Sequence, residues 1–162
     1  MCVNLFGVNN MATEIKFCTP TGEYWFLSPL AAFPIRMMVD GREFTFPTVE
    51  HYYQAMKFYA TDARFNVILG MKNPDDARLI TKTPEYKVNR RADFDNQKYE
   101  IMERGLRARY KQNPDAAKML LQTGDAILLK ACPVCYKCGF GIGSGENRIG
   151  KTLMQIRKEL QK

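Results

Sequence analysis

One short stretch, TVEHYYQAMKF at residues 48–58, carries the side chains that a hydrolytic site needs. On a helix, Glu50, Gln54 and Lys57 fall at positions i, i+4 and i+7, so they share one face, and Tyr53 lies beside them. A carboxylate can stabilise a developing oxocarbenium ion or move a proton. An amine with a lowered pKa can attack the anomeric carbon of a ribose and hold it as a Schiff base. The pattern therefore fits cleavage of a C–N glycosidic bond, although by itself it favours a solvated polar stripe with the tyrosines in the core.

Turn and cap residues indicate the elements that would position this helix. Asp40-Gly41 lies between two β-prone runs, residues 35–39 and 43–46, and predicts a hairpin with a tight turn. After residue 47 the hydrophobic period becomes helical. We expect six helices, which begin with caps such as Thr48 and with Asn-Pro pairs. They lie at about residues 48–59, 62–69, from 74 onward, 95–111, 114–123 and 147–160, and a short buried strand is expected at 126–130.

These elements predict a mainly α, α+β fold: a compact single domain of about six helices with a small N-terminal β-hairpin or sheet. The strand–helix alternation of a doubly wound fold is missing, and no glycine-rich fingerprint supports a Rossmann or P-loop fold. A glycine-dense loop at residues 139–145 could hold a phosphate at the N-terminus of the last helix, or serve as a hinge.

Length and the N-terminal pattern limit the organisation of the chain. A chain of 162 residues fits one domain, and we expect residues 1–13 to be a flexible leader and residues 14–162 to form the domain. No stretch approaches the roughly 18 apolar residues of a membrane helix. The first residues lack the basic run and apolar core of a signal peptide, so we expect a cytoplasmic protein that does not bind a membrane.

The charge of the chain favours phosphate-bearing ligands. Lysine and arginine outnumber the acidic residues and give a net charge of +7. Such a surface attracts nucleotides, phosphosugars or a nucleic-acid backbone, although excess lysine also keeps a protein soluble. The positive residues are spread along the chain, with short clusters only at residues 87–91 and 104–111. This distribution argues against a dedicated nucleic-acid-binding protein.

The five cysteines point to reduced thiols, because an odd number in a chain without an export pattern does not suggest a disulfide framework. Cys132, Cys135 and Cys138 have the two-residue spacing that metal sites use, and His51 or Cys18 could supply a fourth ligand. Three cysteines without an evident fourth ligand are more often small apolar side chains that fill space. We expect no metal site, and we expect His51 to be a packed or capping residue.

Several motifs in a fixed order resemble the NADAR/YbiA family of N-glycosidases. The stretch at residues 48–58 is similar to that family's signature helix. FLS resembles part of an F-L-S-N-F element, RADF an R-x-D-W element, LLQTG an L-L-x-T-G element, and GENRIGKTLM a G-x-N-x-L-G-x-x-L-M element. These four motifs stand at residues 26–28, 91–94, 120–124 and 145–154. The resemblance spans about residues 17 to 160, and a collinear set is more specific than any single motif.

The resemblance implies an α-rich domain that hydrolyses N-glycosidic bonds without a cofactor. The family's substrates are ribosylaminopyrimidine phosphates and, in some members, ADP-ribose attached to guanine bases. Glu50 would be the acid/base carboxylate and Lys57 the covalent amine. The residues expected to contact the substrate are Tyr53, Gln54, Asp93, Lys130, Asn147 and Gly150.

The chain departs from the family pattern at several positions. Lys130 stands where a glutamate is expected, Cys135 where an aspartate is, and Cys138 where a tryptophan is. Phe94 also replaces a tryptophan, and Pro29 replaces an asparagine. Loss of two carboxylates removes acid/base capacity, and loss of an indole removes a stacking surface for a flat base.

The sequence thus predicts an N-glycosidase for a phosphoribosylaminopyrimidine or for ADP-ribose linked to a guanine base. Its partner would be a phosphorylated ribosyl small molecule or an ADP-ribosylated nucleic acid, with no obligate protein partner. Lys130 would be a new phosphate-binding residue. Two alternatives stay open: a non-catalytic module that binds ADP-ribose or nucleotides, and a zinc-stabilised nucleic-acid-binding protein.

Overall fold

The computed structural model describes residues 13–131, 139 and 145–162. The predicted hairpin is present: strand β2 (Ile35–Val39) pairs antiparallel with strand β3 (Arg42–Phe46). The φ angles of Asp40 and Gly41 are 48° and 76°, so both turn residues are left-handed. A two-residue turn of this kind matches the natural twist of the flanking strands, which explains why the Asp-Gly pair marks the hairpin.

A second two-stranded sheet joins distant parts of the chain. Strand β1 (Glu14–Phe17) pairs in parallel with strand β4 (Ile127–Lys130). The carbonyl of Thr13 accepts a 2.8 Å hydrogen bond from the Ile127 amide and extends this ladder. The strand expected at residues 126–130 is therefore present, with β1 as its partner. Residues 1–12 of the expected leader lie outside the described residues.

Seven α-helices and one 3-10 helix account for about half of the described residues. The α-helices are α1 (Val49–Ala55), α2 (Ala63–Leu69), α3 (Pro74–Ile80), α4 (Pro84–Val88), α5 (Phe94–Gln112), α6 (Pro114–Leu121) and α7 (Arg148–Leu160); the 3-10 helix is η1 (Trp25–Leu27). This content confirms the mainly α, α+β prediction. No helix in the described ranges is long and apolar enough to cross a membrane.

Side-chain caps begin several of these helices, as expected. The Thr48 hydroxyl accepts from the His51 amide at the start of α1. The side chains of Asp62 and Asn73 accept from backbone amides in the first turns of α2 and α3. Each cap satisfies an amide that the helix itself leaves without a partner, so the local sequence determines where these helices begin.

Two local features differ from the prediction. Helix α1 ends at Ala55, with Met56 as its C-cap, rather than continuing to about residue 59. Lys57 therefore lies in the turn after the helix, where its amide donates to the Gln54 carbonyl at 3.3 Å. The short helix α4 was not expected, although Thr83-Pro84 at its start is the same kind of opening that predicted other helices.

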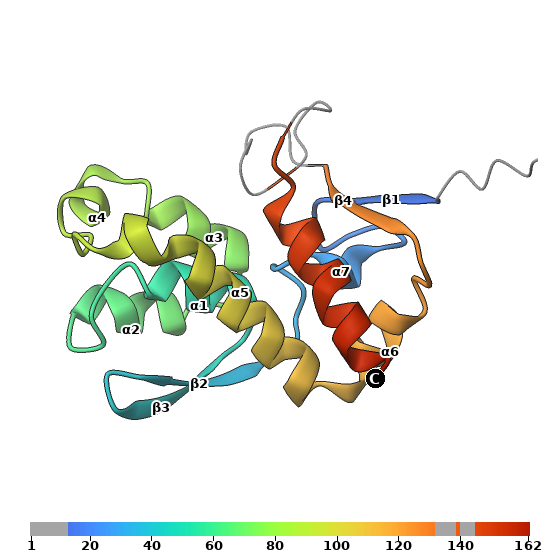
Figure 1. The fold of residues 1–162 in the computed structure, drawn as a ribbon. Coiled ribbons are helices and arrows are strands. Elements are labelled where there is room, and N and C mark those ends of the chain that lie inside the picture. The colour runs from blue at the N-terminus through green and yellow to red at the C-terminus, as the bar shows by residue number, and fades with distance from the viewer. Residues whose placement is uncertain (1–12, 132–138, 140–144) are drawn as a thin grey trace, which may run out of the picture.

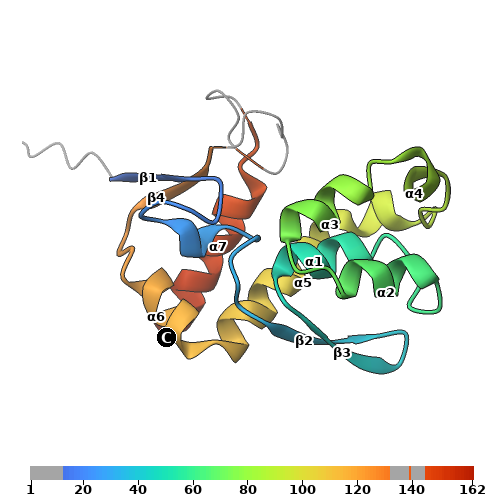
Figure 2. The same cartoon turned by 180° about the vertical axis from the view of Figure 1, so that it is seen from behind.

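Helix α5 runs diagonally through the middle of the molecule, and the other elements lie on its two sides. Helices α1 to α4 are on one side, and α6, α7 and the β1–β4 sheet are on the other (Figures 1 and 2). The core contains fully buried side chains from both sides, among them Tyr52, Phe65, Ile101 and Leu120. This arrangement places α1 directly against α5.

Gly105 on α5 makes the close approach to α1 possible. A Cβ atom at this position would lie 2.9 Å from both Tyr52 Cδ1 and Val49 Cγ1. We expect Gly105→Ala to lower the free energy of unfolding by about 1–3 kcal/mol, since the core would be overpacked. Urea unfolding followed by circular dichroism measures this. Gly70→Ala is the control, because there the nearest atom would be 3.4 Å away; equal losses in both variants would contradict the prediction.

Candidate active site

Glu50 lies in the first turn of α1, where the fold buries its carboxylate. Its amide donates to the Pro29 carbonyl at 3.0 Å, which fixes the start of the helix against the segment after η1. Only 6% of the residue is exposed. One turn later, the Gln54 side-chain amide donates to Glu50 Oε1 at 2.6 Å. The helical spacing predicted for these two residues therefore produces a direct contact inside the protein.

A threonine from the end of α3 connects this pair to Lys57. The Thr81 hydroxyl donates to Gln54 Oε1 at 2.7 Å and accepts from Lys57 Nζ at 3.0 Å. Glu50, Gln54, Thr81 and Lys57 thus form one hydrogen-bonded chain, which we call the α1 cluster. Thr81 was not predicted as a site residue, because it comes 27 positions after Gln54 and belongs to no motif.

Burial moves the pKa values of the two ends of the α1 cluster in opposite directions. Desolvation raises the pKa of Glu50, although the Gln54 hydrogen bond and the charges of Lys130, Lys57 and Arg78 oppose this. Desolvation lowers the pKa of Lys57 to about 8, with the negative charge of Glu50 opposing the change. A carboxyl group that retains a proton more easily and an amine that loses one more easily are suited to acid/base and nucleophilic chemistry.

Two other cations contribute to the lowered pKa of Lys57. The charges of Arg90 and Lys82 repel the Lys57 ammonium and add to the effect of burial. Arg90 and Lys57 also both stand over the Phe94 ring, each 5.7 Å from its centroid. The site therefore has a cationic side, formed by residues around the start of α5 and the end of α3.

Aromatic rings form the wall next to Lys57. Lys57 Nζ lies 5.9 Å from the centre of the Tyr53 ring, and Tyr53 packs edge-on against Phe94 at 5.4 Å. Tyr53 is half-buried, whereas Phe94 is almost fully buried. The phenylalanine that replaces the family's tryptophan still provides a ring beside the amine.

Asp93 lies next to the cluster but is bound to other side chains. Its carboxylate accepts from Arg91 Nε at 2.6 Å and from Gln97 at 2.9 Å. The Arg91 hydrogen bond is the main cause that lowers the pKa of Asp93. The Arg91 amide in turn donates to the Lys57 carbonyl at 2.9 Å. Asp93 is therefore an ionised group that positions Arg91, and its contact with a substrate stays a prediction.

Lys130 comes to the site from the opposite side of the molecule. It ends β4, only 8% of it is exposed, and its ammonium lies 5.9 Å from the centre of the Phe17 ring. Its charge opposes the rise in the pKa of Glu50. The fold therefore brings this lysine, which stands at a glutamate position of the family pattern, close to the buried carboxylate.

Asn147 and Gly150 hold α7 against β4. The Asn147 side chain accepts from the Lys130 amide at 3.0 Å and donates to the Leu128 carbonyl at 2.8 Å. A Cβ atom on Gly150 would lie 2.1 Å from that same carbonyl oxygen, so no larger residue fits there. Both residues thus help to place Lys130 through the backbone. Whether they also line the substrate site stays a prediction.

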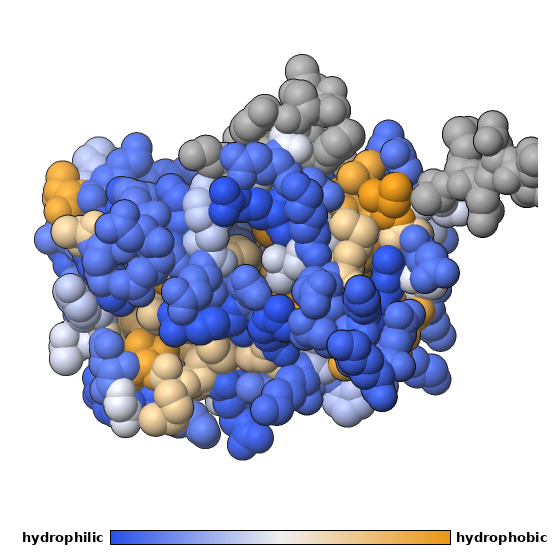
Figure 3. Space-filling model, viewed as in Figure 1, coloured by the Kyte–Doolittle hydropathy of each residue, from blue (hydrophilic) through white to orange (hydrophobic). Residues whose placement is uncertain are grey.

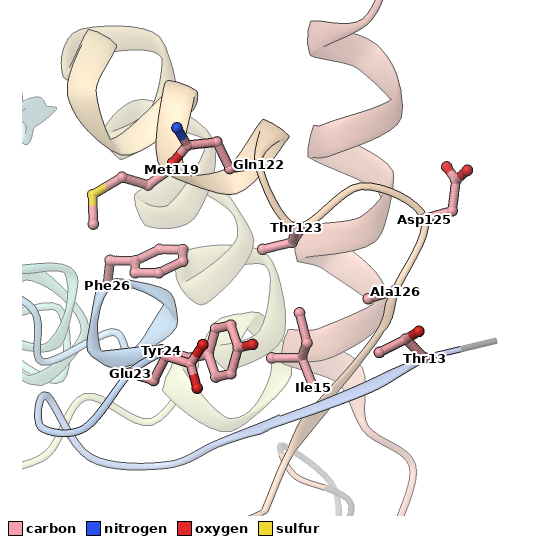
Figure 4. Close-up of a pocket in the computed structure, with 10 residues that line it drawn as sticks. All are labelled: Thr13, Ile15, Glu23, Tyr24, Phe26, Met119, Gln122, Thr123, Asp125 and Ala126. Carbon is pink, nitrogen blue, oxygen red and sulfur yellow. The ribbon is translucent and has the colours of Figure 1, made fainter.

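Two cavities in the described part of the chain differ in their chemistry. A cleft of about 240 Å³ between α5 and α7 includes Tyr53 of the site wall in its lining, together with Lys98, Arg148 and Lys151. A larger cavity of about 710 Å³ lies between β1, η1, α6 and the turn before β4 (Figure 4). Its charged lining residues are Glu23 and Asp125, which would repel a phosphorylated substrate. The larger volume of this second cavity therefore does not make it the better candidate for the substrate site.

A comparison with known protein families now decides what kind of domain this is. Residues 16–161 match the model of the NADAR domain. The chain belongs to the NADAR domain family. The predicted resemblance is confirmed, and the motifs that carried it include the FLS segment before α1, the stretch at residues 48–58 and the start of α7.

The relatives of this NADAR domain include bacterial and plant proteins. The N-glycosidase YbiA of Escherichia coli is 33% identical over 149 residues, which are 91% of this chain and 89% of YbiA. The chloroplastic riboflavin biosynthesis protein PYRR of Zea mays is 37% identical over 129 residues, 75% of this chain. The matched region is only 21% of the length of the maize protein.

The fold agrees with a solved structure of the family. The NMR structure of Escherichia coli YbiA superposes with a TM-score of 0.75 at 32% sequence identity. The superposition covers 93% of this chain and 86% of the YbiA chain. The arrangement of helices and small sheets that positions the α1 cluster is therefore similar to that of Escherichia coli YbiA.

The predictions about cysteine and histidine have different outcomes. Cys132, Cys135 and Cys138, and with them the metal question, lie outside the described residues. His51 is fully buried; its Nδ1 hydrogen-bonds with the Thr48 hydroxyl at 2.9 Å and its Nε2 with the Met71 carbonyl at 3.0 Å. His51 is therefore a packed residue of this NADAR domain, as expected, and both of its ring nitrogens are engaged.

The electrostatic coupling in the α1 cluster can be measured directly. We expect the Lys57 amine to titrate near pH 8, and Glu50→Gln to move this midpoint lower, since removal of the negative charge destabilises the ammonium ion. A titration of ¹³Cε-labelled lysine by NMR, with the Lys57 signal assigned from Lys57→Met, provides the measurement. A Lys57 midpoint near the usual lysine pKa of about 10.4 would contradict the geometry of the cluster.

Proposed function

We propose that this NADAR domain is an N-glycosidase that hydrolyses the N-ribosyl bond of a phosphorylated substrate. The proposed substrates are a phosphoribosylaminopyrimidine or ADP-ribose linked to a guanine base. The observation that carries the proposal is the buried Glu50 carboxyl joined through Gln54 and Thr81 to the Lys57 amine. Relatives that bear the names N-glycosidase and riboflavin biosynthesis protein support the same reaction class.

The first half of the proposed reaction breaks the bond to the base. The neutral amine of Lys57 attacks C1 of the ribose, and the C1–N bond breaks with its electron pair going to the base. Protonated Glu50 gives its proton to the leaving nitrogen, which its raised pKa favours. Glu50 is then an ionised carboxylate. The nitrogen of Lys57 is now bonded to C1 and carries a positive charge.

The second half releases the sugar. The Glu50 carboxylate takes a proton from that nitrogen and passes it to the ring oxygen as the bond between C1 and the ring oxygen breaks. This opens the ribose ring and leaves a protonated Schiff base between Lys57 and C1, with Glu50 ionised again. Glu50 takes a proton from the water that adds to C1 and gives it to the Lys57 nitrogen. The C–N bond then breaks while Glu50 takes the proton of the new hydroxyl group, so the sugar leaves as an aldehyde, Lys57 is again a neutral amine and Glu50 is again protonated. The atoms balance as substrate plus water giving free base plus the phosphorylated sugar, which is ribose phosphate or ADP-ribose, with no cofactor in the proposed route.

The cations around the α1 cluster support a phosphorylated substrate. Lys82, Arg90 and Lys130 all act electrostatically on Lys57 or Glu50. A phosphate group bound among them would neutralise a concentration of positive charge and orient the ribose over the amine. Lys130, with its ammonium over the Phe17 ring, is the proposed contact on the β4 side.

A second candidate function is the binding of ADP-ribose or a nucleotide without turnover. The observation that favours it is Lys130, a buried cation at a position where the family pattern has a carboxylate. Such a replacement removes one acid/base group and adds one phosphate ligand. A zinc-stabilised nucleic-acid-binding protein is less favoured, because His51, a possible fourth ligand, uses both ring nitrogens in hydrogen bonds.

Release of free base by matched variants tests the proposal. We expect Glu50→Gln and Lys57→Met each to slow release from a ribosylaminopyrimidine phosphate or from ADP-ribosylguanine DNA by about 10²- to 10⁴-fold, since each removes a proton-transfer or nucleophilic group. Borohydride should trap the sugar on Lys57 in the wild-type protein. Chromatography quantifies the base, and peptide mass spectrometry locates the adduct.

Two exposed residues provide the controls for charge and side-chain size. Glu100→Gln and Lys118→Met make the same chemical changes on α5 and α6, and both should retain the wild-type rate. Wild-type rates in both Glu50→Gln and Lys57→Met would overturn the enzymatic proposal. Binding of ADP-ribose without any release of base, in protein with an unchanged melting temperature, would establish the binding module instead.

A further inference from the structure

The turn between α3 and α4 carries two threonines whose hydroxyl groups have different surroundings. Thr81 is the C-cap of α3 and only 5% of it is exposed, whereas Thr83 is exposed two residues later. The molecular surface around α4 is mainly hydrophilic (Figure 3). A buried hydroxyl needs hydrogen-bond partners inside the protein, and Thr81 finds two of them in the α1 cluster.

The single proton of the Thr81 hydroxyl points away from Lys57. Two oxygens can accept it, Gln54 Oε1 at 2.7 Å and the Arg78 carbonyl at 3.1 Å, and neither can donate. The orientation of the Gln54 amide follows from Glu50, because a carboxylate only accepts and its Oε1 lies 2.6 Å from the Gln54 nitrogen. The Thr81 oxygen therefore faces Lys57 Nζ, 3.0 Å away, as an acceptor.

This direction matters for the nucleophilic form of Lys57. A neutral amine has two N–H groups and one lone pair. An N–H donated to Thr81 fixes one side of the tetrahedral nitrogen, and the lone pair then points in another direction. A hydroxyl that donated to the amine would instead occupy the lone pair that must attack carbon. The observed network thus holds the amine without using its nucleophilic electrons.

The backbone of Lys57 is held independently of its side chain. Its amide donates to the Gln54 carbonyl at 3.3 Å, and its carbonyl accepts from the Arg91 amide at 2.9 Å. The place of the amine therefore depends on the side-chain torsions. A lysine side chain has many rotamers of similar energy, so a contact at Nζ is needed to select one of them.

The Thr81 contact survives when Lys57 loses its charge. The attraction of Nζ to Glu50 requires an ammonium ion, and so do its contacts with the rings of Tyr53 and Phe94 at 5.9 Å and 5.7 Å. A neutral amine keeps its hydrogen bonds. Among the described residues, Thr81 is the side chain to which Nζ donates. The uncharged amine therefore depends on this hydroxyl for its position.

We propose that Thr81 is a positioning residue for the reaction at the α1 cluster: it holds one N–H of the neutral Lys57 amine and leaves the lone pair free to attack C1 of the ribose. The inference rests on the proposed function for the reaction itself. It adds a residue that none of the sequence motifs indicates. Because Thr81 acts through Lys57, its loss should slow the chemical step and have little effect on substrate binding.

Substitutions of the two threonines test this role. Thr81→Val keeps the branched shape without the hydroxyl, and Thr81→Ala is a second variant that lacks it. With a ribosylaminopyrimidine phosphate, at the maximum of each pH profile, both should lower kcat about 10- to 100-fold and keep KM within about threefold. Thr81→Ser restores the hydroxyl and should restore kcat to within about threefold of the wild-type value.

Thr83→Val is the matched control for loss of a threonine hydroxyl. It makes the same change in the same turn, at an exposed residue whose hydroxyl donates to the Ile80 carbonyl at 2.8 Å. This variant should retain the wild-type kcat and KM. Melting temperatures of all variants show whether a loss of rate reflects a loss of folded protein.

A titration of the Lys57 amine tests the contact without a substrate. With ¹³Cε-labelled lysine, the Lys57 midpoint in Thr81→Val should be about 0.5–1 pH unit lower than in the wild type, because an acceptor stabilises an ammonium ion more than a neutral amine. Thr81→Ser and Thr83→Val should titrate like the wild type. The charged groups that act on Lys57 are the same in all variants: Glu50, Lys82, Arg90 and Asp95.

Three results would overturn the positioning role. They are an unchanged Lys57 midpoint in Thr81→Val, equal losses of kcat in Thr81→Val and Thr81→Ser at wild-type melting temperature, and a raised KM with wild-type kcat in Thr81→Val, which would make Thr81 a substrate contact. If the wild-type protein releases no base while the Lys57 midpoint moves as expected, the glycosidase proposal fails and the Thr81 contact with the amine stands.

Discussion

The buried carboxyl group of Glu50 is the constraint on which the arrangement of the other elements depends. An ionised carboxylate inside a protein costs several kcal/mol unless hydrogen bonds and opposite charges compensate it. Here the compensation comes from three different elements: Gln54 on α1, Arg78 on α3 and Lys130 on β4, with Lys57 in the turn after α1. These elements must therefore meet around α1, and the group that results is also the candidate reaction centre.

A second buried charge holds the segment that positions α1. Arg109 on α5 is fully buried and donates to the Ser28 carbonyl at 2.7 Å and to the Leu27 carbonyl at 3.4 Å. The next carbonyl, that of Pro29, accepts from the Glu50 amide. The guanidinium thus connects the middle of α5 to the first turn of α1. The backbone of the FLS segment thus supports the site, while its side chains anchor the segment: Phe26 and Leu27 are buried in the core, and the Ser28 hydroxyl donates to the Cys18 carbonyl at 3.0 Å.

Local sequence determined much of this molecule. Thr48 and the Asn73-Pro74 pair start helices through their own side chains and ring geometry, and Asp40-Gly41 forms the hairpin turn because both residues tolerate positive φ. The spacing of Glu50 and Gln54 determined that they share a helix face. All of these features depend on residues at most a few positions apart, so patterns could predict them, and the ordered motifs were enough to predict the family.

Tertiary structure decided which groups from outside α1 surround Glu50. Thr81 reaches the site from the end of α3, and Lys130 reaches it because β4 pairs with β1 at the other end of the chain. The burial that brings the pKa values of Glu50 and Lys57 closer together also exists only after α1 packs against α5. No local pattern specifies these encounters, because strand pairing and helix packing join residues far apart in the sequence. The sequence by itself thus determined the candidate catalytic groups, and only the packed fold decided their partners and their protonation.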